Sequence, residues 1–303
     1  NCMSKCTRNF YEDPVHIRNM KLLAAENGYE AWLKKQGVPA VTKEGKAAVV
    51  GGGPAGMAAA YFLRRAGMDV TIFEQNDALG GVVRHVIPEF RIASSAIDKD
   101  AEILNTLGVH VELNTRIKSV DELKAEGFDK VILAVGASKP GTLRLEEGDA
   151  TNALEFLADF KANNGELNIG KNVVVIGGGN TAMDTARAAK RTTGVENVYL
   201  VYRRTKRFMP ADAEELEMAI EDGVEFKELL SPVKVVDGKL TCKVMKLGDI
   251  DESGRRSVVE TDEICEIAAD TVIAAVGEKV PTKFYEANRI NVSERGKALV
   301  NDE

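Results

Sequence analysis

Two stretches of the chain share one hydrophobic pattern. Each has a continuously apolar run, a glycine-rich turn, a helical stretch and a second apolar run, over residues 47–74 and 172–204. Continuously apolar runs are typical of parallel strands that are buried on both faces. Strands that alternate with helices predict a parallel sheet. The repeat therefore predicts an α/β fold with two doubly wound, Rossmann-like nucleotide-binding domains.

The rest of the pattern predicts further elements. Helices are expected over residues 14–36, 94–107 and 212–222, with 149–168 as a crossover helix and loop. Strands are expected over residues 109–113, 130–135, 234–236, 240–247 and 266–276, with shorter candidates at 290–292 and 297–300. Ser95 and Asp98 have the spacing of a capping box. Asp237-Gly238 is a strong hairpin turn signal, and residues 249–257 read as a polar loop.

Composition limits the class of protein. The 303 residues carry a net charge of −7, with 44% hydrophobic residues and a pI of about 5.3. The acidic balance argues against a nucleic-acid partner, and no apolar run approaches the roughly 20 residues that span a bilayer. The four cysteines do not suggest a secreted disulfide framework. We therefore expect a cytoplasmic protein without a membrane segment.

The first glycine turn has the spacing of a dinucleotide-binding loop. Gly51 is expected to make the tight turn, Gly53 to let a pyrophosphate approach the backbone, and Gly56 to let the helix pack on the strand. The helix N-terminus would direct its N–H groups at the phosphates. In the second turn Gly177 and Gly179 take the first two roles, and Ala182 takes the third.

The residues after each second strand differ in charge. Glu74 is suited to accept hydrogen bonds from free ribose hydroxyls, and it would repel a 2′-phosphate. Arg203 and Arg204, with Arg207 nearby, match a phosphate instead. The first turn should therefore bind FAD or NAD, and the second NADP(H). The alternative for residues 202–207 is a solvated basic loop.

Four specific sequence motifs then carry a family resemblance. They are Gly51–Gly56, Leu79-Gly-Gly81 with 87–91, Gly177–Asp184, and Tyr202-Arg-Arg204 with Met209-Pro210. Residues 46–296 resemble the glutamate synthase small subunit and the matching part of dihydropyrimidine dehydrogenase, in the pyridine nucleotide-disulfide oxidoreductase superfamily. The resemblance implies an NADP domain inserted into an FAD domain. The expected segments are a helical remnant of an iron–sulfur domain (1–43), the first part of the FAD domain (44–152), the NADP domain (153–277) and the start of the FAD-domain return (278–303).

The resemblance, together with the glycine and arginine patterns, gives two sets of cofactor-binding residues. The set for FAD is Gly51, Gly52, Gly53, Pro54, Ala55, Gly56, Glu74, Gly81, Arg91, Ile117 and Gly136. The set for NADP(H) is Gly178, Gly179, Asn180, Thr181, Arg203, Arg204, Arg207, Ala275, Val276 and Gly277. Hydride transfer needs no general base, because the flavin does the chemistry. No catalytic side chain is therefore expected.

The N-terminus adds a metal hypothesis. Cys2 and Cys6 have the C-x3-C spacing of the last two cysteines in the family's iron–sulfur domain, and thiolates hold such clusters. The resemblance thus implies that both ligate a [4Fe-4S] cluster in the full-length protein. Lys21 departs from the family pattern, because the family often has Glu or Gln at this position as a ligand of the cluster. The alternative is a pair of free thiols. Cys242 and Cys265 are expected to be ordinary buried thiols.

The resemblance implies an electron-transfer module. NADPH would reduce FAD, and iron–sulfur clusters would carry electrons to a redox partner subunit or domain, or the reverse. A thioredoxin-reductase-like enzyme is one alternative, but it needs a C-x-x-C motif that Cys242 and Cys265 cannot supply. A non-catalytic nucleotide-binding or assembly subunit is the other. Because the chain begins at Asn1 and stops soon after residue 300, we expect a segment of a longer protein that holds half of an FAD site.

Overall fold

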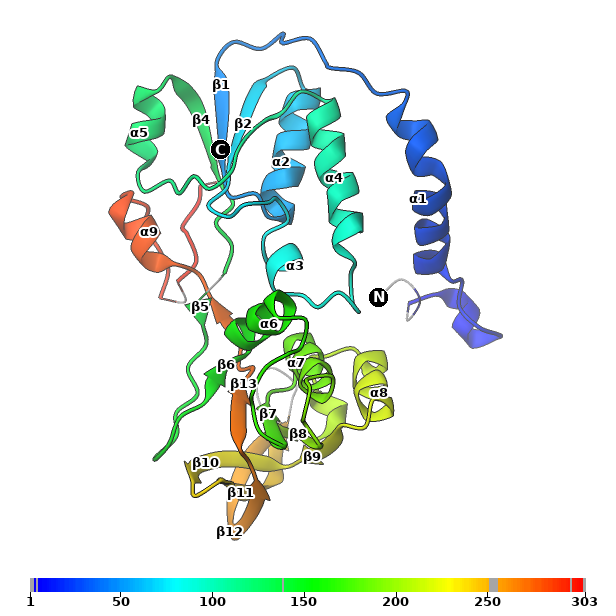
Figure 1. Cartoon of the computed structure of the whole chain (residues 1–303), viewed down its shortest axis with the longest axis vertical. Helices are drawn as coiled ribbons and strands as arrows, with labels where there is room; N and C mark the ends of the chain where they lie inside the picture. Colours follow the sequence, from blue (N-terminus) through cyan, green and yellow to red (C-terminus); the bar gives the residue numbers. More distant parts are fainter. Residues whose placement is uncertain (1–2, 4, 138, 251–255, 295, 302–303) are drawn as a thin grey trace.

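The first glycine unit forms a four-stranded parallel sheet. The computed structural model describes residues 3, 5–137, 139–250, 256–294 and 296–301. The strands lie in the order β3-β2-β1-β4, and Figure 1 labels β2, β1 and β4 of this sheet. Their bounds are β1 (Lys46–Val50), β2 (Asp69–Phe73), β3 (His110–Glu112) and β4 (Phe128–Leu133). All pairs are parallel, as the apolar runs predicted.

Helices cover both faces of this sheet. They are α2 (Pro54–Arg65), α4 (Ser94–Thr106) and α5 (Val120–Ala125), and the short helix α3 (Val82–His85) contacts α4. Ala47 and Val49 face α2 and α4, whereas Ala48 and Val50 face α5. Successive side chains of a strand point to opposite faces, so a strand that is covered on both sides is apolar at every position. This explains the continuous run in the sequence.

The second glycine unit forms a five-stranded parallel sheet in the order β6-β13-β7-β8-β9. Its strands are β6 (Thr151–Asn152), β7 (Asn172–Ile176), β8 (Asn197–Tyr202), β9 (Glu225–Glu228) and β13 (Thr271–Ala274). One face packs on α6 (Ala153–Ala162), α7 (Asn180–Lys190) and α8 (Ala213–Glu221). An antiparallel sheet covers the other face; its strands are β10 (Leu230–Val236), β11 (Lys239–Ile250) and β12 (Arg256–Ala268).

The hairpin between β10 and β11 is confirmed. Asp237 and Gly238 both have positive φ, at 50° and 70°, as a two-residue type I′ turn requires. The single strand expected over 266–276 is wrong, because β12 ends at Ala268 and β13 begins at Thr271. The Asp270 carboxylate accepts the N–H groups of Lys171 and Asn172, which fixes the chain where it passes from one sheet to the other.

Two smaller expectations need correction. The capping box of Ser95 and Asp98 is wrong: α4 begins at Ser94, whose N–H donates to the Glu89 carboxylate at 2.9 Å. Asp98 pairs instead with Arg84. The polar loop over 249–257 is also wrong at its ends, because β11 extends to Ile250 and β12 begins at Arg256; residues 251–255 lie outside the described residues.

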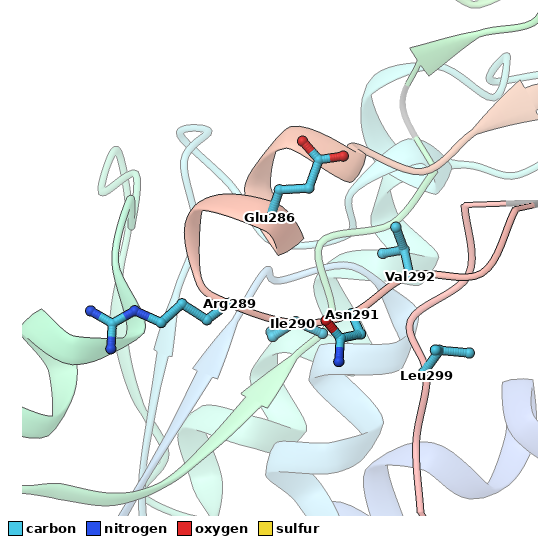
Figure 2. Close-up of a pocket in the computed structure, with 6 residues that line it drawn as sticks. All are labelled: Glu286, Arg289, Ile290, Asn291, Val292 and Leu299. Atoms are coloured by element: carbon cyan, nitrogen blue, oxygen red, sulfur yellow. The ribbon is translucent and has the colours of Figure 1, made fainter.

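The chain returns to the first sheet after the second unit. The crossing strands β5 (Lys139–Pro140) and β14 (Glu278–Lys279) pair antiparallel between the two units, and α9 (Thr282–Ala287) packs against the α5 face (Figure 1). Strands at 290–292 and 297–300 reduce to one bridge between Val292 and Ala298. An open hollow of about 540 Å³ lies beside α9 (Figure 2); its lining residues are Glu286, Arg289, Ile290, Asn291, Val292 and Leu299.

The N-terminal helix α1 (Ile17–Leu33) lies beside the first sheet's helices (Figure 1). Tyr29 donates to the Glu102 carboxylate of α4 at 2.6 Å, and Arg18 pairs with Glu214 of α8 at 2.7 Å. A cavity of about 700 Å³ lies between α1, α2 and α4. The part of the chain that the structure describes also contains two 3-10 turns, η1 (Thr7–Phe10) and η2 (Lys206–Phe208). Among the described residues, no helix is long and apolar enough to cross a membrane.

Candidate functional site

The first glycine turn packs as its spacing predicts. Gly51 has a φ of +104°, and its N–H donates to the Phe73 carbonyl at 2.8 Å. A Cβ at Gly56 would stand 1.9 Å from the Gly51 carbonyl oxygen, so helix α2 could not lie this close to the turn with any other residue. A Cβ at Gly53 would meet no atom nearer than 3.8 Å. That position is therefore open to a ligand rather than required for packing.

A second loop closes over this turn. The Gly80 N–H donates to the Gly52 carbonyl at 2.8 Å, and a Cβ at Gly81 would stand 2.8 Å from the Gly53 Cα. Gly81 also has a φ of +54°, which favours glycine. The two backbones thus lie edge to edge at the N-terminus of α2, where Gly53 is the N-cap and Pro54 the first helical residue. No described side chain caps this end, which leaves its N–H groups for an anion.

Glu74 follows β2 at the edge of the same turn. One carboxylate oxygen accepts the Gly52 N–H at 2.6 Å and the other accepts the Asn76 N–H at 2.8 Å. The residue is only 4% exposed. Each carboxylate oxygen has a further lone pair, so Glu74 can brace the turn and still accept from a ribose hydroxyl.

The remaining residues predicted for FAD lie around this turn. Ile117 packs on the α5 face of the sheet, just after Thr115, whose N–H donates to the Glu74 carbonyl at 2.8 Å. Gly136 follows β4 with a φ of +71° and nothing within 4 Å of a Cβ. Their assignment to FAD remains a prediction.

The second turn repeats the arrangement. A Cβ at Gly177 would stand 2.4 Å from the Ala275 carbonyl oxygen, and one at Gly178 would strike the Tyr202 ring. A Cβ at Gly179 would meet nothing within 4 Å. Gly179 is the N-cap of α7, and no described side chain caps that helix either. Ala182, which stands where the first turn has Gly56, is fully buried beneath the turn.

Other residues predicted to bind NADP(H) lie around this second glycine turn. The Asn180 side-chain oxygen accepts the Asp212 N–H at 3.1 Å, and the Thr181 hydroxyl donates to Glu278 at 3.1 Å. Residues Ala275, Val276 and Gly277 follow β13 beside the turn, and the Ala275 N–H donates to the Ile176 carbonyl at 2.8 Å. These contacts bring the end of β13 and the start of α7 to one place.

The predicted arginines lie directly after β8. Arg203 and Arg207 are exposed, and Arg207 lies 6.0 Å from the centre of the Phe208 ring. The Arg204 Nε donates to the Arg256 carbonyl at 3.2 Å. Arg204 is only partly exposed and is tied to the start of β12. This segment after β8, the arginine loop (residues 203–207), therefore presents positive charge at the position where Glu74 presents negative charge in the first unit.

Arg91 is placed unlike the other residues predicted for FAD. Its Nη1 lies 2.5 and 2.6 Å from the two Glu215 carboxylate oxygens, and its Nε lies 2.8 Å from Asp184 Oδ1. Asp184 belongs to α7 and Glu215 to α8, so Arg91 joins the two nucleotide units. Phe90 strengthens this junction by stacking beneath the guanidinium of Arg191 at 4.4 Å. Binding of Arg91 to FAD remains a prediction.

Asp184 is the buried ionisable residue at this junction that sequence reasoning missed. It is buried, and Oδ1 has no aligned hydrogen-bond donor among the described residues despite the short approach of Arg91. Burial raises the pKa of Asp184 to about 6; Arg91 lowers this pKa and Glu215 raises it. The available signal was an acidic residue at the end of the Gly177–Asp184 phrase, on a helix whose other residues are almost all buried.

The N-terminal metal hypothesis is not settled by the fold. Cys2 lies outside the described residues. Cys6 is a half-buried free thiol, and backbone hydrogen bonds from Val15 and Arg8 lower its pKa. The described residues contain no group of three or more His, Cys, Asp or Glu side chains that could hold a metal ion. Ligation of a cluster by Cys2 and Cys6 remains a prediction.

Comparison with known proteins gives close relatives. YgfK of Escherichia coli (strain K12) is 42% identical over 301 residues, which cover 97% of this chain and 29% of YgfK. The NADP(+)-dependent formate dehydrogenase subunit beta of Moorella thermoacetica is 33% identical, over 97% of this chain and 46% of its own. The NAD-dependent dihydropyrimidine dehydrogenase subunit PreT of Escherichia coli (strain K12) is 32% identical, over 91% and 64%. The chain thus spans less than two thirds of each of these relatives.

A family model covers most of the chain. The model described as pyridine nucleotide-disulphide oxidoreductase matches residues 45–303, from the start of β1 through the return to the first sheet. Both glycine turns, the arginine loop and the Arg91 junction lie within this match. The chain therefore belongs to the pyridine nucleotide-disulphide oxidoreductase family, whose cofactors are FAD and NAD(P)(H).

Proposed function

We propose that the chain is the electron-entry module of a larger flavoprotein oxidoreductase, in which NADPH and FAD exchange a hydride. The first turn would hold FAD and the second NADPH. Bound FAD supplies the redox chemistry, and the protein binds, orients and shields the two nucleotides. The observation that carries the proposal is the pair of open glycine cradles with opposite charge at their edges: Glu74 at one, and Arg203, Arg204 and Arg207 at the other.

The cradles support this assignment. Gly53 and Gly179 each stand at the N-terminus of a helix with space for a ligand where a side chain would project. Backbone N–H groups at these ends would donate to the pyrophosphates. Glu74, held by Gly52 and Asn76, would accept from the ribose of FAD. The exposed arginines would pair with a 2′-phosphate.

The choice of NADPH rests on these arginines rather than on relatives. The formate dehydrogenase relative is named NADP(+)-dependent and the dihydropyrimidine dehydrogenase relative NAD-dependent. Both names belong to subunits. A redox partner subunit or domain is accordingly part of the proposal, with electrons passing to it through iron–sulfur clusters, as the resemblance to the glutamate synthase small subunit implies. Cys6, with its lowered thiol pKa, is a candidate cluster ligand together with Cys2.

Anaerobic titration tests the proposal. The protein is loaded with FAD, in a form that extends beyond residue 303 if the 303-residue chain does not retain the flavin, and the flavin absorbance is followed as NADPH or NADH is added. We expect NADPH to bleach the flavin band with about one equivalent and NADH to do so only at much higher concentration. A flavin that stays oxidised although NADPH binding is measured by calorimetry would contradict the proposal. That result would favour the alternative of a non-catalytic nucleotide-binding subunit.

A further inference from the structure

The fold brings together two cysteines that lie far apart in the sequence. Cys242 of β11 and Cys265 of β12 are direct partners in the antiparallel register. Directly opposed residues in such a pair have Cα atoms about 4.5–5.5 Å apart, with side chains on the same face of the sheet. Disulfides span Cα separations of about 4.4–6.8 Å. The backbone therefore already holds the two thiols at a separation that one S–S bond can bridge.

The two thiols differ in their surroundings. Cys242 is fully buried against the parallel sheet, and burial raises its pKa to about 12, with a further increase from the charge of Cys265. Cys265 is half-buried. The pKa of Lys227 in β9 is raised, first by its hydrogen bond to Glu225 and to a smaller extent by the Cys265 thiolate. The ammonium group of Lys227 is thus within electrostatic reach of the more accessible sulfur.

This pair is separate from both glycine turns. It lies in the antiparallel sheet, on the face of β7 and β8 opposite to α6, α7 and α8. Both cysteines are described as free thiols. Redox-sensing cysteines are typically accessible, near a positive charge, and beside a second cysteine that can resolve the first product. Cys265 is half-buried and lies near the Lys227 ammonium, which also pairs with Glu225, and Cys242 is placed as the second cysteine.

We propose that Cys265 and Cys242 form a reversible thiol–disulfide pair that reacts with small-molecule disulfides. The Cys265 thiolate attacks one sulfur of the small disulfide, whose S–S bond breaks, and the first small thiol leaves. Cys242 then gives up its proton and attacks the Cys265 sulfur, and the second small thiol leaves. The two cysteines lose two electrons, the small disulfide gains them, and the two thiol protons end on the two released thiols. This inference does not depend on the nucleotide assignments.

Peptide mapping after glutathione oxidation tests the pair. The reduced, desalted 303-residue chain is incubated with oxidised glutathione, the remaining thiols are alkylated, and tryptic peptides are analysed by mass spectrometry. Cys242 and Cys265 lie on different tryptic peptides, and both are separate from those of Cys2 and Cys6. We expect a cross-linked peptide that joins Cys242 to Cys265 and that dithiothreitol separates again.

Two variants assign the roles. In Cys242→Ala, Cys265 should stop at a mixed disulfide with one glutathione. In Cys265→Ser, Cys242 should be recovered alkylated only after unfolding, because its thiol is buried. Alkylation of Cys6 serves as the internal control for thiol reactivity, and circular dichroism checks that each variant is folded. The proposal is overturned if the wild type carries glutathione on Cys265 beside a free Cys242. It is equally overturned if both thiols remain unmodified while Cys6 has reacted.

Discussion

Replacing Arg91 with Met should loosen the junction between the two nucleotide units. The methionine keeps the apolar stem that packs there and removes the guanidinium. Asp184 and Glu215 then lose their shared partner, and each of these side chains is only 9% exposed. Two carboxyl groups would remain together in a poorly solvated place, without the cation that lowers the pKa of Asp184.

The cost can be bounded from these contacts. Removing one partner of a buried ion pair costs about 3–5 kcal/mol, most of it from the charge left without compensation. Because Arg91 is 25% exposed, water can partly replace it, so we expect about 3 kcal/mol. The triple variant Arg91→Met, Asp184→Asn, Glu215→Gln removes all three charges. It should return to within about 1 kcal/mol of the wild type, since nothing is left charged and unpaired.

Urea unfolding near neutral pH, followed by circular dichroism, measures these free energies. The matched control is Arg18→Met. It breaks the exposed pair between Arg18 of α1 and Glu214 of α8, the helix that also carries Glu215, and should cost less than about 1 kcal/mol. An Arg91→Met variant that costs no more than Arg18→Met would refute the reasoning. So would a triple variant as unstable as the single one, because that would mean packing rather than charge holds the junction.

Three further predictions concern the arginines after β8, the carboxyl group of Asp184 and the first glycine turn. Arg203→Ala should weaken NADPH binding by about 1.5–3 kcal/mol and leave NADH binding unchanged. The control Arg289→Ala, which removes an exposed arginine paired with Asp121 of α5, should change neither. Equal loss for both nucleotides in calorimetry would contradict the prediction. Burial raises the pKa of Asp184 from 3.8 to about 6, so the contribution of Asp184 to stability should fall by about 3 kcal/mol as pH rises through this window, because the unfolded state loses the proton first. Asp184→Asn should flatten that fall in urea titrations, and an unchanged pH profile would count against it. Gly56→Ala should destabilise the first unit by about 2 kcal/mol or more in thermal unfolding, because the added Cβ would strike the Gly51 carbonyl oxygen; a neutral result would show that α2 can move.

The sequence could predict those features of the fold that are determined by the pattern of neighbouring residues. Ala47 to Val50 are apolar at every position because helices cover both faces of β1, and this identifies a parallel strand without any partner being known. The hairpin at Asp237-Gly238 is equally local, since the turn needs residues that tolerate positive φ. The glycine spacing likewise located both helix N-termini.

Pairings across the fold could not be predicted in this way. Arg91 and Glu215 are 124 positions apart, and only the docking of the two units brings them together. Cys242 faces Cys265 because of the register of β11 and β12, which shifts between Lys243 and Met245. The break at Asp270 was missed because its cause is a hydrogen bond to Lys171 and Asn172, about a hundred positions earlier.

The central claim is that each glycine turn binds its own nucleotide, and two valine variants test it most directly. A Cβ at Gly179 would meet nothing within 4 Å, and one at Gly53 would make only an ordinary contact of 3.8 Å with the Gly81 Cα, so the fold itself should tolerate Gly179→Val and Gly53→Val. The measurement is FAD affinity by flavin fluorescence and NADPH affinity by calorimetry on wild type and both variants. We predict that Gly53→Val loses FAD binding and keeps NADPH binding, and that Gly179→Val does the reverse. Loss of both affinities in either folded variant, or of neither, would contradict the account.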